Sequence, residues 1–157
     1  MLKSKGMPKL LRIIFRVLGV IILIVAIVSL FSFCVQLYSH YKTNIWRPLL
    51  TLSFVGFGFI GFYAFWGYKK WLVVILGINF INVLSTQALK LTYQGTCCST
   101  TPSRAAIAIL LSGSVLLLVY FSRHRLNGAY LKWLPILIFA GFILLNQISL
   151  RHLLGVW

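Results

Sequence analysis

Five apolar blocks, each about as long as a bilayer core is thick, dominate this chain of 157 residues. A helix needs about 20 apolar residues to cross a hydrocarbon core of ~30 Å. Because lipid supplies no hydrogen-bond partners, each segment must satisfy its own backbone, which favours helices. The sequence therefore predicts an all-α integral membrane protein, one domain with a bundle of about five transmembrane helices, over residues 17–38, 49–68, 71–89, 105–121 and 133–150.

The charged residues are all cations. The chain has 15 Lys and Arg residues and no Asp or Glu, so its formal net charge is +15. It therefore lacks side-chain carboxylates for acid–base catalysis, for hard metal ions and for proton relays across a membrane. We expect no enzymatic activity, no metal and no cofactor.

The scatter of the cations over short loops argues against nucleic acid as a partner. Two partners remain. Membrane lipids with anionic headgroups attract each nearby cation by ~1 kcal/mol. An acid-rich membrane protein would supply the same counter-charge, and we expect one.

The basic residues are divided unequally between two sets of loops. Ten lie in the N-terminal segment, at residues 69–70 and in the connection 123–132, and five lie in the other set. Cytoplasmic loops carry the excess of Lys and Arg. The count predicts a cytoplasmic N-terminus and an external C-terminus, and no cleavage pattern follows the first apolar block. A bacterial inner membrane is the simplest location for such a protein.

The basic N-terminal segment has its own pattern. Lys5, Lys9, Arg12 and Arg16 are spaced as on one helix face, with apolar residues between them. This spacing predicts an amphipathic lead-in that lies on the cytoplasmic leaflet.

Small residues gather in the second apolar block, where Gly56 to Gly61 matches the pattern G-x-G-x-x-G. A dinucleotide site would need this turn between a strand and a helix, with an acidic residue about 20 positions later. Neither condition holds inside an apolar span. A packing face is the better interpretation, because small residues let helices approach closely. We expect it at Ser53, Gly56, Ala64 and Gly67, with a second contact at Ala108 and Ser112.

Polar residues mark one face of the third apolar block. Asn79, Asn82, Thr86 and Lys90 are spaced 3, 4 and 4 apart, which places them on one side of a helix. In the predicted orientation most of this face shares the outer half of the membrane with Asn146 and Gln147. Two interpretations stay open: hydrogen bonds between helices, or an outward-facing pocket or path.

Three cysteines are present. Cys97 and Cys98 are adjacent in a loop predicted to lie outside, where an oxidising compartment favours a disulfide in some form. Inert thiols are one alternative, and a soft-metal site with His40 and His152 is another. Cys34, inside the first apolar block, is expected as a buried apolar filler.

These observations support three functional hypotheses. The favoured one is a non-catalytic multi-span subunit or accessory protein of a larger membrane protein complex. The alternative is a small oligomeric transporter or channel for an anionic or lipidic substrate, not coupled through carboxylates. The third is a membrane enzyme that handles a metal or haem through His40, His152 and the cysteine pair. Retention of an acid-rich partner distinguishes the first, and a visible spectrum or bound metal distinguishes the third.

Overall fold

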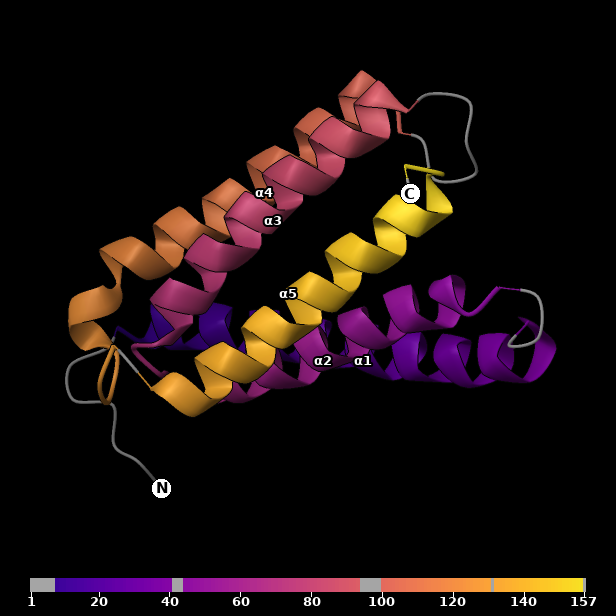
Figure 1. Ribbon diagram of the computed structural model, residues 1–157. Helices are drawn as coiled ribbons and strands as arrows, with labels where there is room; N and C mark the ends of the chain where they lie inside the picture. Colours follow the sequence, from indigo (N-terminus) through magenta and orange to yellow (C-terminus); the bar gives the residue numbers. More distant parts are fainter. Residues whose placement is uncertain (1–7, 41–43, 94–99, 131, 157) are drawn as a thin grey trace.

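The computed structural model describes residues 8–40, 44–93, 100–130 and 132–156, and in these ranges it is helical without a strand (Figure 1). Each of its five long helices is long and apolar enough to cross a membrane. The predicted all-helical class and the count of five membrane-length helices are therefore confirmed for the described residues. The helices are α1 Lys9–His40, α2 Trp46–Trp66, α3 Leu72–Thr92, α4 Pro102–Phe121 and α5 Trp133–Leu153, with a short 3₁₀ turn, η1, at Arg123–Arg125.

The largest boundary difference lies at the start of α1. This helix begins at Lys9 rather than at Val17 and runs without a break to His40. Arg12 and Arg16 therefore occupy the first turns of this long apolar helix and not a separate helix. Lys5, the other member of the predicted lead-in, lies outside the described residues. Lys and Arg are good helix formers, and their long stems can carry the charge to the interface, so the helix has no reason to stop where the hydropathy falls.

The helices form two antiparallel hairpins that diverge from a shared vertex, with α5 between them (Figure 1). The α1–α2 contact is the most extensive in the molecule, and α4 packs on α3. Helix α5 contacts both α2 and α3, whereas α2 scarcely touches α3. The second hairpin is consequently attached to the first mainly through α5.

Close backbone approach defines the α1–α2 interface. A Cβ placed on Gly58 would lie 2.4 Å from the Cβ of Ala26, and one on Gly61 would lie 3.3 Å from Ile22. Glycine is required at Gly58, because real Cβ contacts are never this short. This is the small-residue mode of membrane helix packing.

The vertex joins segments far apart in the sequence. The Lys70 amide donates to the Asn127 carbonyl at 2.9 Å, and the Asn127 amide donates to the Tyr68 carbonyl at 2.7 Å. Arg16 Nε donates to the Tyr68 hydroxyl at 3.2 Å. A cluster of large side chains fills the interior here, including Phe15, Phe65, Trp71, Leu72, Leu126 and Phe139. The vertex is therefore the tightly closed end of the molecule.

Several Lys and Arg side chains at the vertex make cation–π contacts with aromatic rings. Arg123 lies over the Tyr120 ring at 4.0 Å, Lys70 over Tyr130 at 5.4 Å and Lys69 over Tyr63 at 5.8 Å. Such contacts contribute ≈ 0.5–1 kcal/mol at exposed sites. The chain has no Asp or Glu, so these rings, together with neutral oxygens such as the Tyr68 hydroxyl that Arg16 contacts, take the place of carboxylate partners.

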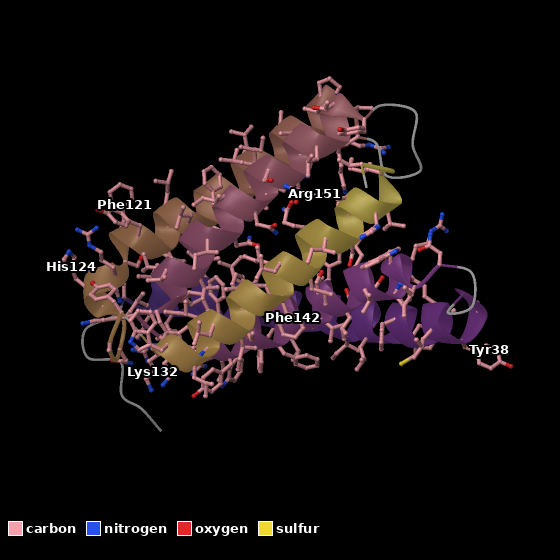
Figure 2. All side chains as sticks on the ribbon, viewed as in Figure 1. Tyr38, Phe121, His124, Lys132, Phe142 and Arg151 are labelled. Carbon is pink, nitrogen blue, oxygen red and sulfur yellow. The ribbon has the colours of Figure 1, made fainter. Side chains whose placement is uncertain are left out.

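Side-chain contacts also join helices at the opposite end. The rings of Trp46 and His152 stack with centroids 3.8 Å apart, which ties the end of α5 to the start of α2. The Thr51 hydroxyl donates to Gln36 Oε1 at 3.0 Å between α2 and α1. Figure 2 shows Tyr38 and Arg151 at this end and His124 and Lys132 at the vertex.

Candidate functional site: a polar seam and a groove

The polar residues predicted on α3 meet α5. Gln147 Nε2 donates to Asn82 Oδ1 at 2.6 Å and to Thr86 Oγ1 at 3.1 Å. Ser85 Oγ lies 3.5 Å from Gln147 Oε1. We name Asn82, Thr86 and Gln147 the polar seam. It joins the second hairpin to α5 at about the middle of the bundle.

A second polar pair joins α5 to α2. Asn146 Nδ2 donates to Ser53 Oγ at 3.1 Å, and Ser53 Oγ donates to the Leu50 carbonyl at 2.6 Å. Both side chains are buried. Asn146 Oδ1 is also buried, and within the described part of the chain no donor reaches it. One turn further along α2, the Phe142 ring fills the space that a side chain on Gly56 would occupy.

The predicted packing residues thus face two different helices. Ser53 and Gly56 contact α5, while the glycines that α1 needs are Gly58 and Gly61. Ala64 is fully buried. Gly67 lies past the end of α2 as its C-cap, beside the Lys69 side chain of its own turn.

On α4 the expected contact residues are only partly buried. Ala108 and Ser112 are both half-buried. A Cβ on the neighbouring Gly113 would lie 3.4 Å from Phe80 of α3, an ordinary van der Waals distance. Helix α4 therefore rests on α3 without the close backbone approach seen between α1 and α2.

A groove of about 370 Å³ separates α2 from α3, with α5 as its floor. Its α3 wall carries every residue of the predicted polar face: Asn79, Asn82, Thr86 and Lys90. Asn146 reaches it from α5. The structure brings together both expected features, because part of the polar face is bonded between helices and part lines an open space.

The cysteine predictions have two outcomes. Cys97 and Cys98 lie outside the described residues. Cys34 is a free, exposed cysteine on α1, so the prediction that it is a buried filler was wrong. The outer face of α1 is apolar and exposed along its length, for example at Ile24, Val28 and Phe31, and a thiol suits such a lipid-facing surface as well as a core.

No protein-family model, curated protein or solved structure matches this chain.

Proposed function

We propose that the chain is a non-catalytic multi-span component of a larger membrane protein complex, with an acid-rich membrane protein as its partner. One observation carries the proposal: Asn82, Thr86, Gln147 and the Asn146–Ser53 pair form hydrogen bonds between helices. Polar side chains that form hydrogen bonds between helices favour a structural role for the chain over a catalytic role. Because the chain has no Asp or Glu, a catalytic part would also lack its usual acid and base.

The basic vertex is the expected docking surface. Arg125 and Lys132 are exposed there, and no hydrogen bond or cation–π contact holds either side chain within the described ranges. Further cations sit close by, at Lys69, Lys70 and Arg123. An acidic segment of a partner protein would meet several cations that this chain does not neutralise itself.

A pull-down with matched charge variants tests the proposal. Tagged protein is extracted gently from native membranes, and the bound proteins are quantified by mass spectrometry. We expect a stoichiometric acid-rich partner with the wild type. The double variant Arg125→Gln/Lys132→Gln should lose it, whereas Arg47→Gln/Arg104→Gln, with two exposed cations at the other end, should keep it. A wild-type chain that emerges alone or only as a homo-oligomer would overturn the proposal.

We also propose that the vertex faces the cytoplasm of a bacterial cell, in the inner membrane, with the N-terminus inside and the C-terminus outside. The three cation-rich segments meet at one end through Arg16, Tyr68, Lys70 and Asn127, and the more basic side of a membrane protein faces the cytoplasm. Glutamine in the pull-down variants keeps this end the more basic one. A reporter active only outside the cytoplasm, fused to the C-terminus, should be active. An inactive reporter, with the same fusion active after residue 70, would reverse the orientation.

The groove gives specific support to a second candidate, a passive transporter or channel for an anionic or lipidic substrate. Its lining includes polar side chains, such as Asn79 and Lys90, that make no hydrogen bond to another helix among the described residues. Reconstituted vesicles should then show transport that Asn82→Leu abolishes while the variant remains folded. If Asn82→Leu weakens assembly with the partner and no transport exists in the wild type, the scaffold function stands alone.

A further inference from the structure

One face of α3 changes character along the groove. Towards the vertex it presents Leu72, Ile75 and Leu76, and towards the open end it presents Asn79, Asn82, Thr86 and Lys90. The polar stretch from Asn79 to Lys90 is about 16 Å long at 1.5 Å rise per residue. A groove that is apolar at one end and polar at the other matches a ligand with the same two parts.

The opposite wall is apolar along its whole length. It is built from Phe54, Phe57 and Phe65 of α2, with Phe139 on the floor from α5. Ligand sites have this composition, in which apolar and aromatic walls carry a few placed polar groups. The volume of about 370 Å³ also lies in the usual range for a small-ligand site.

The charge of the groove is positive and unbalanced. Lys90 is the one charged side chain among the described residues that line it. No carboxylate exists in the sequence to neutralise it. Asn146 Oδ1 is buried and accepts no hydrogen bond within the described part of the chain, and Lys90 is therefore the group on which an anionic ligand would be held.

A transmembrane helix from a partner does not fit this space. Such a helix is about 10 Å across and about 30 Å long, several times larger than the groove. A lipid acyl chain is thinner than a helix and can lie in the groove, and lipid surrounds the protein in the membrane.

We propose that the groove binds one anionic membrane lipid, with its headgroup against Lys90 and one of its acyl chains along Leu76 and Ile75 towards the vertex. The Asn79–Thr86 stretch of α3 then lies beside the glycerol region. This proposal does not depend on the protein complex proposed above.

Lipid titration of the purified full-length chain in neutral detergent tests the headgroup. Binding of phosphatidylglycerol and of phosphatidylcholine with identical acyl chains is measured by native mass spectrometry. We expect the wild type to prefer phosphatidylglycerol by about fivefold, the effect of one nearby cation. Lys90→Gln should remove the preference. Arg104→Gln removes an exposed cation from the start of α4, at the same end of the second hairpin as Lys90, and it should keep the preference.

A second pair of variants tests the groove itself, so that a misfolded variant does not decide the matter. Asn79→Phe fills the groove at a residue that makes no helix-to-helix hydrogen bond in the described ranges, and it should abolish retention of the lipid. Leu84→Phe adds the same ring on the exposed side of α3 and should retain it.

Four results would overturn the proposal. The first two are equal affinity of the wild type for the two lipids and an unchanged preference in Lys90→Gln. The third is retention of lipid by Asn79→Phe. The fourth is displacement of the lipid by glycerol phosphate, which has no acyl chain, as effectively as by phosphatidylglycerol. An acidic protein segment found cross-linked to Lys90 in the native complex would assign the groove to a partner instead. Absence of any protein partner would leave the expected lipid preference unchanged.

Discussion

The first hairpin is held together, and the second hairpin is attached to α5, by opposite kinds of contact. Between α1 and α2 the contact is dry and close, with Gly58 against Ala26 and Gly61 against Ile22. Between α3 and α5 the contact is polar, with Gln147 donating to Asn82 and Thr86. The first contact brings backbones together over most of two helices, whereas the second holds α3 to α5 through side chains and leaves a groove beside it.

The difference shows what each kind of contact can do in lipid. Without a hydrophobic force between helices, shape and hydrogen bonds determine association. Small residues give extensive van der Waals contact, but they leave no room for a ligand. Amide side chains keep the helices apart while fixing their register, and the space they hold open is available for binding.

The largest effect is expected at the dry interface. Gly58→Leu would force a side chain into the space of Ala26, whose Cβ would be only 2.4 Å from the new Cβ. Overpacking costs typically 1–3 kcal/mol and occasionally more, so we expect the free energy of unfolding to fall by about 3 kcal/mol. Reversible unfolding in mixed micelles measures it. Gly77→Ala, where no atom lies within 4 Å, is the control and should not destabilise; equal losses in both would refute the close approach.

A smaller effect is expected at the polar seam. Gln147→Leu removes the donor for both Asn82 and Thr86. Hydrogen bonds of this kind average ≈ 0.6 kcal/mol, so the loss should be about 1 kcal/mol in the same unfolding assay. Ile148→Leu, at an exposed position next to it, should change stability by less than a few tenths of a kcal/mol. If the two variants behave alike, the seam does not hold α3.

The aromatic partners of the cations should contribute less still. Tyr120→Leu removes the ring beneath Arg123, and the expected loss is about 0.5 kcal/mol. Phe121→Leu removes a more exposed ring at the same end of α4. An equal loss in the two variants would show that the cation–π contact adds nothing beyond the buried area of the ring.

The smallest effect is expected between α3 and α4. A Cβ on Gly113 would meet Phe80 at 3.4 Å, so Gly113→Ala needs almost no adjustment. We expect a change within about 0.5 kcal/mol, since alanine also favours the helix. A loss as large as that of Gly58→Leu would mean that this hairpin is closely packed like the first.

The sequence predicts the helices well because hydropathy and length act locally. It also places the polar face of α3, since residues three and four apart share a side of any helix. It does not reveal the partners of that face. Both Gln147 of α5 and the groove lie opposite α3 only because the hairpins diverge, and no local pattern encodes that angle.

The glycines show the same limit. Residues 56–61 contain three glycines. Gly56 can belong to one face of the helix, and Gly58 and Gly61 to another. The spacing of small residues alone predicts Gly56 as the helix contact. In the structure α1 packs against Gly58 and Gly61, whereas Gly56 makes room for the Phe142 ring of α5. Choosing between the faces requires knowing which helix lies on which side of α2. Gly19 and Ala26 on α1 carry the complementary signal, because small residues on two neighbouring spans can be matched.

The polar seam is proposed to hold α3 against α5. A double-mutant cycle between Asn82 and Gln147 tests this most directly. The free energy of unfolding is measured for Asn82→Leu, Gln147→Leu and the double variant in mixed micelles. We predict a favourable coupling of about 0.6 kcal/mol, with ~1.7 kcal/mol as the upper end for such pairs. A coupling of zero would contradict the claim and turn attention to these side chains as the lining of a path.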